Sequence, residues 1–516
     1  MFKINWLLRF FLIAQITAGA VLCGVLSIFL LLSLYTWPSS ADDLCLANYF
    51  EEYGVFDGLY GKYMQWTGVY TSIFLIGAVP QLGDYYSFYR LLPLSIILLT
   101  VGVSIAFFRV LFRTSRPAVW HWVMGVAFTV LFLSSMPTVV SGFYWFSSAA
   151  KYQGGNIFLI CLLLVFMRLV RSAHLPLHEK TKDYLLAGVC ITLGVGFSET
   201  QMMMFYAVVT LMCFWRISVE RANARVNFVW LGLFVWMNCC AAISILAPGN
   251  FIRSEIESSV HMTSISMADA IHLSIALGIQ GIKRYLSLPQ IWWFSGLLVG
   301  IVLAVRSDKS SSDSKPTQVR GAYIGLGLLF CLVFPIISQF PSLKYLSAPP
   351  PLRTENVILF SFLLSWSVTL VLFLYWVLDK WPRIDRRLES ASKSIRLANS
   401  LLRTVLMLGF VGSVLAASNI QTAYVDVTKV APAYSDFMSS RYQELLALKG
   451  SGAAIIVSQY KNPPKTIHSL DIVSIENGYD FSVCFAEYFG VDLKVIDDTG
   501  VIGEHSDSQL NTESAR

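Results

Sequence analysis

The sequence predicts an all-α polytopic membrane protein with about 11 transmembrane helices. Hydrophobic residues make up 55% of the 516-residue chain and charged residues only 14%, which is about half the charge of a typical soluble protein. Apolar runs of roughly 18 residues or more recur along the chain, and such runs are long enough to cross a bilayer as helices. The runs are continuous and do not alternate with polar residues, which argues against a membrane β-barrel.

The basic residues predict how these helices are oriented. A formal charge of +6 is compatible with an acidic partner such as nucleic acid, but the Lys and Arg residues cluster in short segments between apolar runs, as they do on the cytoplasmic side of membrane proteins. Lys3 and Arg9 therefore place the N-terminus in the cytoplasm. The first span, at about 10–36, is too long for the core of a signal peptide, so we expect it to remain uncleaved.

Residues 37–89 are expected to form one long first outer loop, because the next span, at about 90–112, ends in a basic cluster. Apolar residues recur within the loop at three- and four-residue steps, which is typical of a helix lying in the membrane interface. These residues are Leu59, Tyr63, Trp66, Tyr70 and Phe74. A further span at 66–82 is the alternative, but it would place the basic cluster outside.

The remaining spans follow the same alternation. We expect them at about 118–136, 152–170, 228–247, 290–305, 321–338, 356–378 and 403–418, with two further crossings inside 184–215. Residues 254–288 would form an outer segment. The transmembrane domain would thus be 1–418, followed by a small extracytoplasmic α/β domain at 419–516. That domain has a helical pattern at 433–448, β-like runs at 453–458 and 491–496, and a disordered tail.

The cysteines and histidines show no metal-ligand spacing. Of the nine cysteines, only Cys45 and Cys484 fall in predicted outer segments. A disulfide between them and two free thiols are both open at this point.

Two adjacent carboxylates, Asp42 and Asp43, directly follow the first span. Carboxylates this close to hydrocarbon are costly, so they mark either a solvated helix end or a functional site. Two like charges cannot both point into one site, so one should act and the other should orient the loop. We expect Asp43 to be the catalytic residue, with Asp42 as the second candidate. Glu199, in a turn between two short crossings, needs a partner or wet surroundings for the same reason.

This layout resembles the GT-C superfamily of membrane glycosyltransferases and, more narrowly, a bacterial family of GT-C-like multi-spanning proteins. The segments that carry the likeness are Asp42-Asp43, Trp66–Tyr70, Phe197–Thr200, Ala247–Arg253, Arg441-Tyr442 and Tyr488–Gly490. The resemblance implies an enzyme of the bacterial cytoplasmic (inner) membrane with its C-terminus outside. It would transfer a sugar from a polyprenyl-phosphate-linked donor to an envelope glycan or lipid acceptor on the extracytoplasmic side.

The resemblance also implies roles for individual residues. The acid near the first span would serve as general base or as ligand of a divalent metal, Mg or Mn, with Asp42 as the metal ligand. Val69 stands where related loops often carry Arg, so we do not expect this position to bind phosphate.

The chemistry of such a transfer agrees with these assignments. It needs a carboxylate that takes a proton from an acceptor hydroxyl and cations that stabilise the leaving phosphate. We expect donor phosphate binding by Arg253, Arg353 and Lys151, and substrate contacts by Glu199, Trp66 and Asn250. The structural alternatives are Arg side chains that snorkel to the interface and aromatic residues that form an interfacial belt.

Three other functions remain open. A transporter or flippase of a lipid-linked glycan would favour internal repeats and ionisable residues at mid-span, and the chain has no clear repeat. A glycan polymerase or ligase usually carries its main functional loop late in the chain, whereas the acidic pair here is early. A non-catalytic envelope assembly protein could use the C-terminal segment as its binding module.

Overall fold

The computed structural model describes residues 2–40, 42–112, 119–172, 176–219, 224–261, 265–307, 321–346, 348–381, 393–469 and 482–496. Eight helices in these ranges are long and apolar enough to cross a membrane. They are Trp6–Tyr35, Tyr85–Leu111, Phe146–Arg171, Glu199–Ile217, Val226–Ile245, Tyr323–Lys344, Leu352–Lys380 and Leu397–Leu415. The chain is therefore a predominantly α-helical, multi-pass membrane protein.

A bent helix pair and two shorter helices lie at the other predicted crossings. Helices α13 (Met267–Leu286) and α14 (Pro289–Ser307) together meet the criteria for a span but are bent by 67° at the break between them. Helices α7 (Val119–Ser135) and α9 (Thr181–Val195) have only 17 and 15 residues. The total of eleven crossings stays a prediction, because two of them depend on these short helices.

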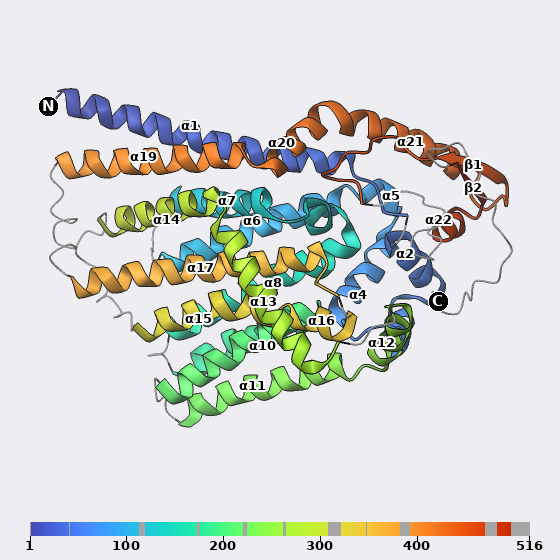
Figure 1. Cartoon of the computed structure of the whole chain (residues 1–516), viewed down its shortest axis with the longest axis horizontal. Coiled ribbons are helices and arrows are strands. Elements are labelled where there is room, and N and C mark those ends of the chain that lie inside the picture. Colours follow the sequence, from blue (N-terminus) through green and yellow to red (C-terminus); the bar gives the residue numbers. More distant parts are fainter. Residues whose placement is uncertain are drawn as a thin grey trace.

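The long helices run side by side as a bundle (Figure 1). They are α1 (Phe2–Leu32), α6 (Leu91–Leu111), α8 (Phe146–Arg171), α10 (Glu199–Phe214), α11 (Ala224–Ile245), α15 (Gly321–Ile337), α17 (Leu352–Lys380) and α19 (Lys393–Leu415). Helix α15 packs on α17, and α1 packs on α19, which lies at the other end of the sequence. Buried phenylalanines fill the interior, with Phe128 against Phe360 and Phe132 against Phe143.

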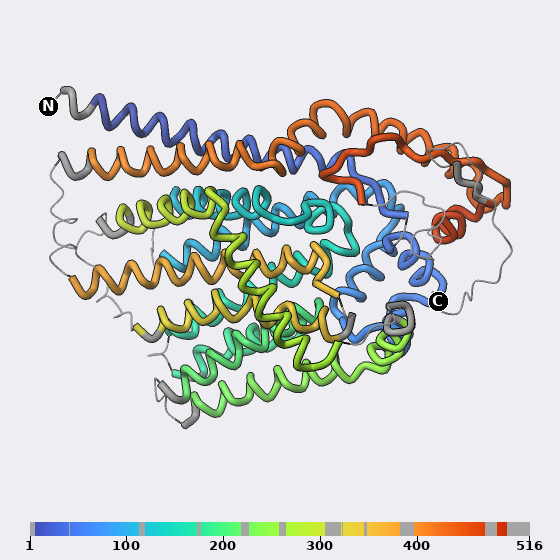
Figure 2. The backbone as a smooth tube through the Cα atoms, in the orientation of Figure 1, coloured from blue at the N-terminus to red at the C-terminus, as the bar shows by residue number. Residues whose placement is uncertain are grey.

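Helix α13 departs from the sequence prediction. Residues 254–288 were expected to form an outer segment, but α13 crosses the long helices obliquely (Figure 2) and contacts α15 and α16 (Phe340–Leu346). Gly278 allows the crossing, because a Cβ there would lie 2.7 Å from the backbone of Ile336. The small-residue contact, which a hydropathy reading does not detect, is what brings α13 onto the bundle.

Short helices gather at the end of the bundle that holds the acidic pair (Figure 1). They are α2 (Asp42–Tyr53), α3 (Val55–Gln65), α4 (Tyr70–Ala78), α5 (Tyr85–Phe88) and α12 (Pro248–His261). Helix α2 begins with two carboxylates, which the positive end of the helix dipole favours. It ends at Gly54, whose φ of 75° is accessible mainly to glycine.

The interfacial helix predicted from Leu59 to Phe74 is wrong as a single element. The structure divides it into α3 and α4, with a break at 66–69. The break is fixed by contact with a distant loop: Gly68 N–H donates to Asn250 Oδ1 at 3.0 Å, and a Cβ on Gly68 would lie 1.9 Å from the carbonyl oxygen of Ser244. Close packing against that loop outweighs the helical periodicity.

The tail segment, defined here as residues 418–469 and 482–496, lies at the same end as α2 (Figure 1). It contains α20 (Ser418–Val425), α21 (Ala431–Ala447), β1 (Ala454–Ser458), α22 (Ser482–Phe489) and β2 (Asp492–Ile496). The two strands pair in parallel, with Ala454 opposite Asp492. The helical pattern at 433–448 and the β-like runs at 453–458 and 491–496 are confirmed as secondary structure. The final dozen residues, expected as a disordered tail, lie outside the described residues.

Candidate functional site

Asp43 is a fully buried carboxylate that joins α2 to the start of α8. Its Oδ2 accepts hydrogen bonds from Ser39 N–H at 3.0 Å and from the Tyr89 hydroxyl at 2.8 Å. Its Oδ1 accepts from both the N–H, at 2.9 Å, and the hydroxyl of Ser147. Tyr89 Oη in turn accepts from Phe146 N–H. Two N–H groups of the first turn of α8, which have no partner inside the helix, are thereby satisfied from outside it.

Burial raises the pKa of the Asp43 carboxyl, and the hydrogen bonds from Ser147, Ser39 and Tyr89 oppose that rise. Every oxygen of this carboxylate already has its partners, and none of its surface is exposed. Such an environment suits a residue that holds two helices together.

Asp42 has the opposite surroundings. Its side chain is exposed to solvent, although the protein around it is dense enough for burial to raise the pKa of the carboxyl. Four cations oppose this shift: in decreasing order of effect they are Arg353, Lys151, Arg253 and Lys62. We call these four residues the cation cluster. They come from α17, α8, α12 and α3. Together with α2, which carries Asp42, five elements of the fold contribute charged residues to this place.

Lys62 is the member of the cation cluster that lies closest to the acidic pair in sequence. Its Nζ sits 4.0 Å from the centre of the Tyr49 ring, a favourable cation–π position. Burial lowers the pKa of Lys62 to about 8, and the charge of Asp42 opposes that shift. Lys62 therefore changes its charge within a range that an assay can reach.

Glu199 is the second carboxylate near the cation cluster. It begins α10, and its Oε2 lies 3.7 Å from Lys151 Nζ. The expectation that this carboxylate needs a partner is thus confirmed, and the partner comes from α8. Four cations against two carboxylates leave the group with a net positive charge.

Each of the two arginines of the cation cluster lies against a tryptophan. Arg253 Cζ lies 5.5 Å from the centre of the Trp66 ring, and Arg353 Cζ lies 5.4 Å from that of Trp145. A cation–π contact of this kind orients a guanidinium. Trp66, predicted to contact substrate, thus also supports Arg253.

Asn250 has a structural position. Its Oδ1 accepts from Gly68 N–H, and its Nδ2 donates to the carbonyl oxygens of Ser244, at 2.7 Å, and Ile245, at 3.2 Å. These bonds fix the break between α3 and α4 against the end of α11. The predicted substrate contact of Asn250 stays a prediction, and its observed bonds position Trp66 and Arg253 on either side of the junction.

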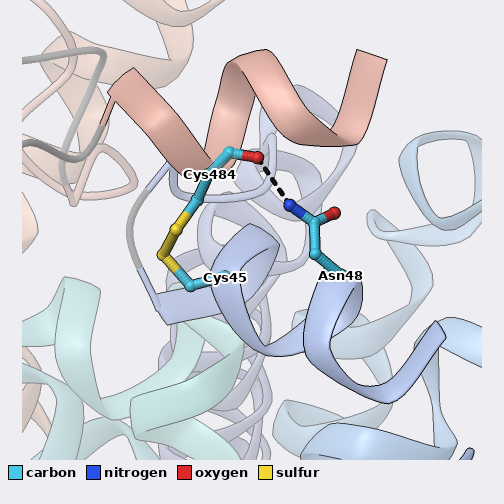
Figure 3. The surroundings of a disulfide bond; sticks show 3 residues. All are labelled: Cys45, Asn48 and Cys484. Carbon is cyan, nitrogen blue, oxygen red and sulfur yellow. Dashed lines mark hydrogen bonds between the residues drawn. A yellow bond between two sulfur atoms is a disulfide. The ribbon is translucent and has the colours of Figure 1, made fainter. Parts of the chain in front are cut away.

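The tail segment is fastened to α2 one turn after the acidic pair (Figure 3). Cys45 and Cys484 form a disulfide across 439 residues of sequence, and Asn48 Nδ2 donates to the Cys484 carbonyl oxygen at 2.7 Å. An aromatic contact supports the same attachment, with the rings of Tyr86 and Tyr442 stacked 4.6 Å apart. The tail segment therefore restrains the helix that carries Asp42.

A divalent metal at Asp42 does not fit these surroundings. The charged groups that act on the Asp42 carboxyl are four cations. Among the described residues, no three His, Cys, Asp or Glu side chains lie close enough together to hold a metal ion. The four cations around Asp42 favour an anion over a metal ion at this place.

A concave surface on the tail segment does not offer comparable chemistry. A shallow pocket of about 440 Å³ lies on the tail segment and is lined by Gly452, Glu487, Gly490 and their neighbours. Its charged lining residues, Glu487 and Asp492, are both acidic, so it lacks the cations that surround Asp42. We therefore place the candidate site at Asp42.

Sequence reasoning brought most of this group together and missed some members. The structure collects Asp42, Glu199, Lys151, Arg253 and Arg353 at one place, as expected of a common site. Lys62 was only one of several outer cations in the sequence analysis. Tyr89, at the end of α5, and Ser147, on α8, had no sequence signal as partners of Asp43, because only the fold brings them to it.

The chain was compared with known proteins. It matches no protein-family model, no curated protein and no solved structure.

Proposed function

We propose that the protein is a membrane glycosyltransferase of GT-C type that uses a polyprenyl-phosphate-linked sugar. The observation that carries the proposal is the placement of a solvent-exposed carboxylate, Asp42, among four cations at one end of a bundle of membrane-spanning helices. A lipid-linked donor has its phosphate at the membrane surface, which is where such a group of residues would meet it.

Asp42 is assigned the role of general base in this proposal, and Asp43 that of a positioning residue. Asp42 takes the proton from an acceptor hydroxyl, whose oxygen then forms a bond to the anomeric carbon of the sugar. The bond between that carbon and the phosphate oxygen breaks, and the electron pair leaves with the polyprenyl phosphate. The raised pKa of Asp42 makes it a stronger base.

The cation cluster stabilises the leaving phosphate. Fixed cations stabilise the negative charge that develops on the phosphate, and they do so most strongly where less water is present than in bulk solvent. Arg253 and Arg353 are suited to bidentate contacts and Lys151 to a point-charge contact. Glu199 holds Lys151 in place and offers a carboxylate to sugar hydroxyls.

The remaining parts of the proposal concern the membrane. The N-terminus is cytoplasmic, eleven crossings lead to an extracytoplasmic C-terminal domain, and the acceptor is an envelope glycan or lipid of a bacterial inner membrane. The positive residues between the spans support this orientation.

Mass spectrometry of envelope glycans and polyprenyl-linked sugars tests the proposal in cells with and without the gene. We expect one glycan to lose a single sugar in the deletion strain and its lipid-linked donor to accumulate. Loss of the whole glycan together with an accumulated complete lipid-linked glycan would instead indicate a flippase.

A further inference from the structure

Several buried polar atoms close to Asp42 have no hydrogen-bond partner among the described residues. They are Ser40 Oγ, Trp145 Nε1, Ser148 Oγ and Arg353 Nε. Ser40 and Ser148 are 3% and 4% exposed, so bulk water does not replace the missing partners. A buried donor without a partner is destabilising, and native proteins rarely keep several of them together without a bound water, ion or ligand.

Three of these donors are neighbours on the bundle. Arg353 lies against the Trp145 ring, 5.4 Å from its centre. Trp145 is the N-cap residue of α8 and Ser148 is the third residue of that helix, two positions whose side chains lie next to each other in a helix start. Lys151 follows Ser148 by three residues and so shares its helix face.

These hydrogen-bond donors lie next to residues that contact or influence the acidic pair. Ser147, the residue before Ser148, binds Asp43, and Arg353 has the largest effect of the four cations on Asp42. The unpartnered donors therefore border the cation cluster on its α8 and α17 side. Arg253, against Trp66, belongs to the α3 and α12 side.

The chemistry of these donors defines what they can bind. An indole N–H and a guanidinium N–H only donate, which rules out a metal and favours a ligand with several acceptor oxygens. The surrounding net positive charge favours an anion over a neutral sugar hydroxyl. A phosphate oxygen meets both conditions and accepts several hydrogen bonds at once.

We propose that Trp145, Ser148 and Arg353 form a phosphate-binding subsite for a phosphate ester. The indole N–H, the hydroxyl and the guanidinium each donate to phosphate oxygens, and Lys151 adds charge from the same helix face. The identification of the ester as the donor lipid rests on the proposed function, but the subsite itself is defined by its unpartnered donors.

Binding of farnesyl phosphate to the purified full-length protein tests the subsite. The protein is kept in dodecyl maltoside, a detergent without phosphate, and binding is measured by isothermal titration calorimetry. A hydrogen bond to a charged group contributes about 1.5–3 kcal/mol. Trp145→Phe, which keeps the ring, and Ser148→Ala should therefore each weaken binding by roughly 10- to 100-fold.

Matched controls remove equivalent groups that already have partners. Trp236→Phe removes an indole N–H that donates to Thr192, and Ser365→Ala removes a hydroxyl that donates to the Ser361 carbonyl. Neither should change the affinity. If one subsite variant does not fold, the other still tests whether the subsite binds farnesyl phosphate. Arg353→Lys, which loses the planar donor set but keeps the charge, tests the same point.

Three outcomes separate the alternatives. Wild-type affinity in both Trp145→Phe and Ser148→Ala would overturn the subsite and assign these donors to ordered water. Equal affinity for farnesyl phosphate and inorganic phosphate would overturn the lipid as the source of the phosphate. A third outcome is that farnesyl phosphate binding depends on Trp145 and Ser148 while the glycans of the deletion strain are unchanged. That result would support the subsite and contradict the glycosyltransferase proposal.

Discussion

At the scale of the residue, the surroundings of Asp42 and Asp43 differ because α2 directs the two side chains to different sides. Asp43 points into the bundle and meets four hydrogen-bond donors, whereas Asp42 remains exposed beside the cation cluster. The repulsion argument predicted that one carboxylate of the pair acts and the other orients the loop, and the sequence analysis preferred Asp43 for catalysis. The geometry favours Asp42, because a base must reach an acceptor with an oxygen that is not already committed to partners.

Asp43→Asn tests the structural role. The amide nitrogen would face N–H or O–H donors in place of an acceptor, so the free energy of unfolding should fall by about 1.5–3 kcal/mol. Thermal unfolding of the purified protein measures this. Asp57→Asn, on an exposed carboxylate of α3, is the control and should leave the midpoint unchanged. Equal midpoints for Asp43→Asn and wild type would show that Asp43 does not join α2 to α8.

The pKa of Lys62 gives a prediction on pH. Lys62 is charged below about pH 8 and loses its charge as the pH rises through that value, so farnesyl phosphate binding should weaken between pH 7 and about pH 9. The ligand itself does not titrate there, because the second pKa of a phosphate monoester is about 6. Lys62→Arg keeps the charge and should abolish the decline. The same decline in that variant would assign it to another group.

At the scale of the element, α2 is held at two points. Asp43 attaches its first turn to α8, and the Cys45–Cys484 disulfide attaches its next turn to α22. Since Asp42 belongs to the same first turn, both attachments set where its carboxylate lies relative to the cation cluster. The tail segment is thus part of the support of the site.

Reduction of the disulfide should loosen that support. Removing it should lower the free energy of unfolding by about 2–4 kcal/mol, measured as a lower unfolding midpoint of wild type after treatment with a phosphine reductant. Cys484→Ser should show the lower midpoint already, without a further effect of reduction. Alkylation of both thiols in the untreated wild-type protein would contradict the pairing.

Some elements could be predicted from the sequence and others could not. Long spans such as α1 and α17 and the strand pair β1 and β2 follow from local hydrophobicity and residue type, and they lie close to their predicted positions. The break between α3 and α4, the path of α13 and the bond from Asp43 to α8 depend on contacts between elements that are separated in the sequence. Contacts between separate elements leave no local pattern.

At the scale of the whole molecule, the candidate site and the start of the chain lie at opposite ends of the bundle. Helix α1 begins at the end where α17 finishes and α19 starts, while α2, α12 and the tail segment occupy the other end (Figure 1). If the N-terminus is cytoplasmic, Asp42 and the cation cluster face the extracytoplasmic side.

Reporter fusions test this orientation. The basic segments predict that a reporter after Arg116, Arg225 or Arg396 is cytoplasmic, and that one after Asn419, at the start of the tail segment, is extracytoplasmic. Alkaline phosphatase and green fluorescent protein fusions report the two sides. An extracytoplasmic reporter after Arg116 would reverse the order of the crossings and remove Asp42 from the proposed side.

The most direct measurement of the central claim is glycan restoration by Asp42→Asn in the deletion strain. The variant keeps the shape of the side chain and removes the base, whose loss typically slows a reaction by about 10²–10⁴-fold. We expect mass spectrometry to find almost none of the restored glycan in this strain at equal membrane abundance, and full restoration by Asp57→Asn. Restoration by Asp42→Asn to the level of wild type would contradict the role of Asp42 as the base.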